Sequence, residues 1–155
     1  MRTDQASILD WLVGHDPLEI VPLEDPVIDA VGFDPRSPYV EVFWLPVIGP
    51  SATWAARAMV RTLGRSPNGV RVPVGPFAAQ LGLGGGVGRH SPVIRTFGRL
   101  VTFGLAEIVG DQYAVRRTFP PLARRHVLRL PPHLAALHPE TMTSSQADEH
   151  NAVAG

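Results

Sequence analysis

The amino-acid sequence predicts an α+β protein, mainly helical, with one compact core. Its 155 residues are 45% hydrophobic, which is enough to bury one domain and leave polar tails. Residues 51–63 and 92–103 repeat their apolar side chains at the 3.6-residue spacing of amphipathic helices. Residues 105–109 and 112–117 flank a Gly110-Asp111 pair, which is the pattern of a two-residue β-hairpin.

The first third of the chain is acidic and interrupted by proline. Residues 1–38 contain five prolines, so we expect a loosely structured N-terminal arm with one short helix at residues 6–13. Residues 39–45 are rich in β-branched and aromatic side chains and are followed by Pro46. This composition predicts a short N-terminal strand.

A helix is predicted next, from Ser51 as N-cap through residues 51–63, with Gly64 as its stop. Its apolar face comprises Ala52, Ala55, Ala56, Met59, Val60 and Leu63, and the opposite face carries Thr53, Arg57 and Arg61. Residues 70–72 favour a short strand, and residues 76–81 favour a brief helix.

A second amphipathic helix follows a glycine-rich connector. Residues 82–88 fit no phosphate-loop pattern and follow a helix, so we interpret them as a flexible turn. Ser91-Pro92 is typical of a helix start, and the helix is expected to run over residues 92–103. Its apolar face comprises Ile94, Phe97, Leu100 and Val101, and its outward strip comprises Arg95, Arg99 and Thr102.

The C-terminal part predicts a helical extension at residues 118–138 and a disordered tail at residues 139–155, which have little to bury. The extension carries Arg124, Arg125 and Arg129, which are expected to reinforce a basic face or to meet an acidic segment of a second copy.

The net charge of zero hides a strong separation of charge along the chain. All fourteen basic residues are arginines, and twelve of them lie in residues 57–129 beside only two acids, Glu107 and Asp111, which gives 12 − 2 = +10. Residues 1–56 contain two arginines and nine acids, which gives 2 − 9 = −7. A middle segment this basic attracts polyanions, and nucleic acid is the first candidate.

The order of helix, short helix, glycine turn, capped helix and β-hairpin resembles a winged helix-turn-helix domain over residues 51–117. The chain also resembles a family of uncharacterised proteins from high-GC Gram-positive bacteria, in the residues Phe43-Trp44-Leu45-Pro46, Gly49-Pro50-Ser51 and Arg95-Thr96-Phe97-Gly98-Arg99-Leu100. The resemblance implies a domain at residues 39–117, a recognition helix at residues 92–103 and a wing at residues 105–117. The function it implies is double-stranded DNA binding by a non-enzymatic transcriptional regulator.

The outward strip of the recognition helix supplies the candidate base contacts Arg95, Arg99 and Thr102, since arginine can bond bidentately to guanine in the major groove. Residues at a helix N-terminus favour phosphate. The candidate phosphate contacts are therefore Arg89, His90 and Ser91, with Gln112, Arg117, Arg57, Arg61 and Arg71 as weaker candidates. Outward arginines are also what any amphipathic helix of an arginine-rich protein would present.

A second hypothesis is a winged-helix protein-interaction module whose basic face docks an acidic partner. We also expect a homodimer, from the apolar residues Trp11, Leu12 and Trp44 and the C-terminal leucines. No cofactor, metal site, small-molecule ligand or catalytic residue is predicted. The chain contains no cysteine, its six histidines show no zinc-binding spacing, and no membrane span is indicated. The expected location is the cytoplasm, with the bacterial nucleoid as the place of a DNA-binding protein.

Overall fold

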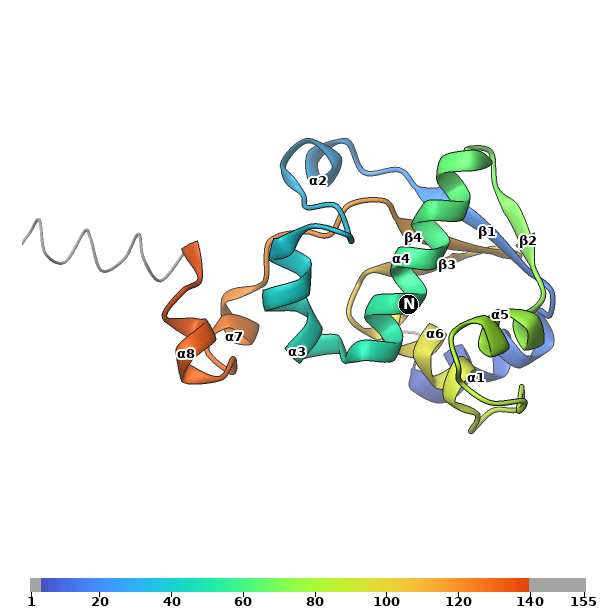
Figure 1. Ribbon diagram of the computed structural model, residues 1–155. Coiled ribbons are helices and arrows are strands. Elements are labelled where there is room, and N and C mark those ends of the chain that lie inside the picture. The colour runs from blue at the N-terminus through green and yellow to red at the C-terminus, as the bar shows by residue number, and fades with distance from the viewer. Residues whose placement is uncertain (1–3, 140–155) are drawn as a thin grey trace, which may run out of the picture.

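The computed structural model describes residues 4–139, which form an α+β fold of eight α-helices, one π-helix and four strands (Figure 1). In chain order these are α1 (Gln5–Gly14), β1 (Leu18–Leu23), α2 (Pro26–Val31), the π-helix η1 (Val40–Trp44), α3 (Leu45–Ile48), α4 (Pro50–Arg65), β2 (Val70–Val72), α5 (Val74–Gln80), α6 (Pro92–Thr102), β3 (Ala106–Val109), β4 (Gln112–Arg116), α7 (Arg124–Val127) and α8 (Pro132–Ala135). The predicted disordered tail, apart from Pro139, lies outside the described residues.

The four strands form one mixed sheet in the order β2-β1-β4-β3, and α4 lies over it, against β1 and β4 (Figure 1). Strand β1 is antiparallel to β2 and parallel to β4, so it is an interior strand. Its Leu18 and Ile20 are buried and alternate with more exposed neighbours, as in a half-buried strand. The prediction of a loosely structured arm over residues 1–38 was therefore wrong, because its apolar residues complete the sheet.

The predicted strand at residues 39–45 was also wrong. This segment forms η1, which continues directly into α3. Val40, Phe43 and Trp44 are buried at the i, i+3, i+4 spacing of one helical face. The Trp44 indole Nε1 donates a hydrogen bond to the Pro120 carbonyl at 2.9 Å, which the helical turn makes possible by placing the ring toward the C-terminal segment.

Both predicted amphipathic helices are present. The first, α4, begins at Pro50 with Gly49 as its N-cap at φ 84°, so the prediction of Ser51 as the N-cap was wrong. It continues past Gly64 and ends at Arg65. Helix α6 begins at Pro92 with Ser91 as its N-cap and ends one residue before the predicted end. The side chains expected to be buried are buried, except that Val101 of α6 is only partly so.

The hairpin is present as β3 and β4, with Gly110 at φ 60° in the turn between them. The Tyr113 ring of β4 lies wholly in the core, and its hydroxyl donates a hydrogen bond to the Phe97 carbonyl of α6 at 2.8 Å. Strand β4 pairs with β1 on its other edge, so the hairpin is built into the sheet and is not a separate projecting ribbon.

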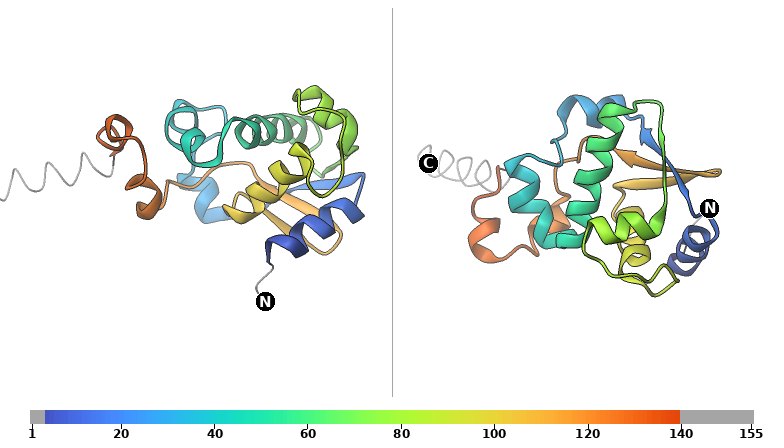
Figure 2. Two further views of the ribbon diagram at one scale, coloured as in Figure 1. Left: turned by 90° about the horizontal axis from the view of Figure 1, so that it is seen from below. Right: turned by 45° about the vertical axis from the view of Figure 1, so that its right-hand side comes forward.

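Helix α1 packs against α6, and both views in Figure 2 place them together near α5. The absence of a side chain at Gly98 allows this approach, since a Cβ there would lie 3.1 Å from Leu9 Cδ2. Leu12 is wholly buried in this contact region, and Trp44 is 3% exposed. Two of the residues from which a dimer was predicted therefore belong to the core of their own chain.

The C-terminal extension forms α7 and α8, on the far side of the molecule from α1 (Figure 1). Val127 and Leu130 are buried, whereas Leu128 and Leu137 are exposed. In the part of the chain that the structure describes, no helix combines the length and apolar character that crossing a bilayer requires.

Candidate nucleic-acid interface

The outward face of α6 carries the three residues predicted to contact DNA bases. Arg95, Arg99 and Thr102 are exposed, while Ile94 and Phe97 on the other side of the helix are buried. The three exposed residues line one side of an open cleft of about 420 Å³. The start of α4 and Gln5 of α1 also line it.

Arg99 is held in place on this cleft. Its guanidinium Nη1 donates a hydrogen bond to the Ile48 carbonyl at 3.1 Å. A Cβ on Gly49 would lie 3.4 Å from the same Nη1 atom, and Gly49 has the left-handed φ of 84° that suits glycine. Ile48 and Gly49 form the junction between α3 and α4, so this junction positions the guanidinium.

Thr102 is less available than the sequence suggested. Its hydroxyl donates a hydrogen bond to the Gly98 carbonyl one turn earlier at 3.0 Å, which leaves only its lone pairs for another group. An anion accepts hydrogen bonds and therefore needs donors. Arg95 and Arg99 supply these donors on the α6 face, and Thr102 does not.

Four arginines elsewhere on the domain pair with acids of residues 10–25. The ion pairs are Arg71 with Glu19 at 2.8 Å, Arg89 with Asp10 at 3.1 Å, Arg116 with Asp25 at 2.8 Å, and Arg117 with Glu24 at 3.0 Å. Arg95 and Arg99 have no carboxylate within ion-pair distance among residues 4–139, and no carboxylate lines their cleft. Positive charge without a carboxylate partner therefore lies on α6, and among the described residues also on α4 and in the C-terminal extension, at Arg57, Arg61, Arg65, Arg124, Arg125 and Arg129.

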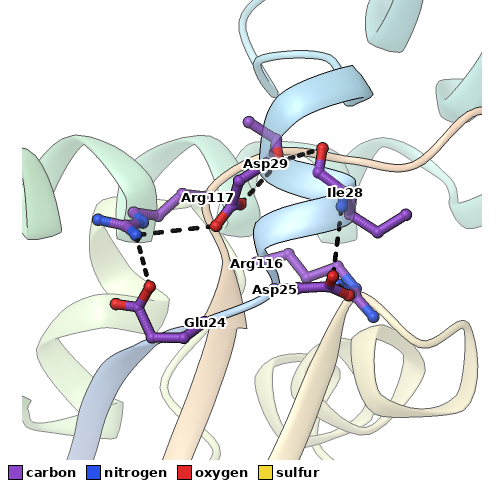
Figure 3. A network of polar contacts seen from close by, with 7 residues as sticks. Glu24, Asp25, Ile28, Asp29, Arg116 and Arg117 are labelled. Atoms are coloured by element: carbon purple, nitrogen blue, oxygen red, sulfur yellow. Dashed lines mark hydrogen bonds and ion pairs between the residues drawn. The ribbon is translucent and has the colours of Figure 1, made fainter.

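Figure 3 shows the largest of these neutralising networks, where α2 and the end of β4 meet. Arg117 reaches Glu24 and, at 3.9 Å, Asp29, so the wing arginine predicted to contact phosphate already has two acidic neighbours. Arg116 donates a hydrogen bond to Asp25, and this bond, with a second one from the Ile28 N–H, lowers the pKa of the Asp25 carboxyl below its usual 3.8.

The predicted anchor at the N-terminus of α6 is only partly available. Arg89 pairs with Asp10 of α1, and the Ser91 hydroxyl donates to the Gly88 carbonyl at 2.6 Å instead of capping the helix. His90 is fully on the surface. Of Arg89, His90 and Ser91, only the His90 side chain therefore has no ion-pair or hydrogen-bond partner among the described residues.

The weaker candidates are scattered over other faces. Arg57 donates to the Pro35 carbonyl at 2.8 Å and lies 5.2 Å from the Trp54 ring centroid. Arg61 lines the same hollow as Trp54, away from the α6 cleft, and Gln112 is exposed at the start of β4.

The basic surface of α6 extends toward α7. Phe103, the residue after α6, lies with its ring centroid 5.6 Å from that of His126. Partial burial lowers the pKa of His126 below its usual 6.5, and the charges of Arg125 and Arg129 lower it further. Arg125 and Arg129 lie one and three residues from His126 in the sequence, and His126 lies beside Phe103, which follows α6.

Sequence reasoning missed two parts of this surface. It did not place Gln5 or Ser51 beside the cleft. Ser51 was interpreted as a helix cap. It also did not find which acids pair with which arginines. The opposite charges of residues 1–56 and 57–129 were the available signal for such pairing.

Comparisons with protein-family models, with curated proteins and with solved structures give no match to this chain. The functional argument therefore depends on the geometry and charge of the site.

Proposed function

We propose that this chain binds double-stranded DNA as a non-enzymatic regulator, with α6 as its recognition helix. The order α4, β2, α5, α6, β3, β4 supports the proposal, since it is the element order of a winged helix-turn-helix domain. A helix with its side chains is about 10–12 Å across, and the major groove is about 12 Å wide.

The observation that carries the proposal is a pair of exposed arginines on α6, beside a cleft that no carboxylate lines. Arg95 and Arg99 keep their charge unopposed on α6, while Arg71, Arg89 and Arg117 have carboxylate partners. Two arginines at i, i+4 spacing on one helix face favour a polyanion lying along α6.

The wing contributes less in this proposal than in most winged-helix domains. Strand β1 covers the edge of β4, and Arg117 is occupied by acids, so Gln112 is the hairpin's remaining contact. In this proposal Arg125 and Arg129, which lie one and three residues from His126 in the sequence, contact the DNA backbone beside Phe103 at the end of α6.

The test uses a pool of short random-sequence duplexes and fluorescence anisotropy at low salt. The variant Arg95→Ala/Arg99→Ala is expected to bind about tenfold more weakly or worse, since each charge-assisted hydrogen bond contributes about 1.5–3 kcal/mol. The control Arg71→Ala/Arg117→Ala removes the same charge from arginines that already have partners, and should stay within about twofold of the parent. Equal losses in both variants, or no duplex binding by the parent, would contradict the proposal.

The same pool gives a second readout. Selection with the parent protein is expected to enrich a motif, and selection with Arg95→Ala/Arg99→Ala is not, because the two residues hold α6 in register on the duplex. A motif enriched equally by both would show that α6 does not determine the preference.

A protein-interaction module is the second candidate, and one observation favours it. Trp54 is 58% exposed beside Arg57 and Arg61, and tryptophan with arginine is the composition of protein-interface hot spots. This candidate predicts that the chain binds polyglutamate and that Trp54→Ala abolishes the binding. Duplex binding without polyglutamate binding would exclude it.

A further inference from the structure

The cleft beside α6 has the composition of an anion site. It is open to solvent and has a volume of about 420 Å³, which leaves room for a phosphate group. Two arginines line it, and no aspartate or glutamate does. Two guanidinium groups that lie in one cleft without a carboxylate need solvent or an anion beside them.

The donors converge from two elements. Arg95 and Arg99 lie four residues apart on α6, so their side chains leave the same face about 5–6 Å apart. Arg99 uses one of its five N–H donors on the Ile48 carbonyl, which fixes its plane and leaves the others for a ligand.

The start of α4 adds a neutral donor. The Ser51 hydroxyl lines the cleft and makes no hydrogen bond to any described residue. A hydroxyl and two guanidinium groups, with no carboxylate beside them that would favour a cation, are the donors that phosphate oxygens require.

We propose that this cleft binds one phosphate group, with Arg95 and Arg99 as its charged ligands and the Ser51 hydroxyl as a third donor. The inference deepens the proposed DNA binding and rests on it for the identity of the natural ligand. Under that proposal, the phosphate belongs to the duplex backbone, and the two arginines position α6 rather than read base edges. The same chemistry would also bind the phosphate of a free phosphorylated molecule.

The experiment titrates the whole chain with inorganic phosphate, and separately with a short DNA duplex, at ionic strength held constant with chloride. Arginine Nε–H and backbone amide signals are followed by NMR. Phosphate is expected to shift the signals of Arg95, Arg99 and Ser51. The variant Arg95→Ala/Arg99→Ala should weaken phosphate binding by about tenfold or more.

The matched control is Arg61→Ala/Arg65→Ala, which removes two exposed arginines at the same i, i+4 spacing from α4, outside the cleft. It should bind phosphate within about twofold of the parent. A Ser51→Ala variant should lose a smaller part of the affinity and keep the shifts at both arginines. An unchanged thermal midpoint in each variant shows that the fold is intact.

The outcomes separate this inference from the proposed function. Phosphate and duplex shifts that both centre on the cleft support both. Phosphate shifts without duplex binding support the cleft, overturn DNA binding and identify a free phosphorylated ligand as the source. Duplex binding without phosphate shifts in the cleft, or phosphate shifts of equal size in the two double variants, would overturn the inference.

Discussion

Replacing Leu12 by alanine tests whether the acidic N-terminal segment belongs to the core. Leu12 is wholly buried where α1 packs on α6 near Gly98, and buried Leu→Ala substitutions cost about 2.7–5 kcal/mol. For a chain of this size, each kcal/mol lowers the thermal midpoint by about 2–4 °C, so we expect a decrease of at least roughly 6 °C. The neighbouring Val13 is 44% exposed, and Val13→Ala should change stability by no more than about 0.5 kcal/mol.

The assay is urea unfolding followed by tryptophan fluorescence and by far-ultraviolet circular dichroism. Parent and both variants should show coincident transitions with one slope, so that the midpoints report stability alone. Equal midpoints for Leu12→Ala and Val13→Ala would refute the reasoning, because they would mean that α1 does not pack on α6.

Three further predictions concern buried and charged groups. Tyr113→Phe should destabilise the fold by about 1–2 kcal/mol in urea unfolding, because the buried hydroxyl loses its bond to the Phe97 carbonyl; a cost under about 0.5 kcal/mol would contradict that bond. Because Arg116 lowers the pKa of Asp25, their pair stabilises the fold above about pH 3.8 and ceases to do so as the pH falls through the lowered pKa. The difference between the urea midpoints of Arg116→Ala and the parent should therefore narrow in acid, where only the Arg116 bond to the Gly104 carbonyl still distinguishes them, and a constant difference would exclude the pair. The pKa of His126, measured by NMR titration, should lie below 6.5. The free energy of unfolding should then decrease as the pH falls below 6.5, because the unfolded chain binds this proton first. A pKa above 6.5 would contradict the partial burial of His126.

The helices with strong periodicity could be predicted from the sequence. The buried and exposed faces of α6 follow from apolar residues at helical spacing after a Ser91-Pro92 start. The hairpin follows from the Gly110-Asp111 turn between two β-branched runs. Both signals are local, since all the residues that carry them are close in sequence.

The N-terminal third could not be predicted as well, because its structure depends on distant partners. Strand β1 is six residues long, contains Pro22, and pairs with β4 more than ninety residues later, as in Glu19 opposite Gln112. Residues 39–45 have a β-type composition, and tertiary contacts favour the helical turn, among them the packing of Trp44 against Phe119 and its hydrogen bond to the Pro120 carbonyl.

Only part of the candidate site could be predicted, because some of its features depend on local spacing and others on residues far apart in the sequence. The outward direction of Arg95 and Arg99 is a property of one helix and follows from spacing. The neutralisation of Arg117 by Glu24 joins residues 93 positions apart, and the total charges of the two segments do not specify the pair. The cleft requires the start of α4 to face α6, which no local pattern encodes.

The most direct test of the central claim is the salt dependence of duplex binding, measured as log K against log salt concentration by fluorescence anisotropy. For Arg95→Ala/Arg99→Ala, the slope is expected to become shallower by about 1.8, since each phosphate contact contributes about 0.9. For the matched variant Arg71→Ala/Arg117→Ala, the slope should equal that of the parent, because these arginines already pair with Glu19 and Glu24. A slope unchanged by the first variant, or reduced equally by both, would contradict the claim that the exposed arginines of α6 form the DNA-binding face.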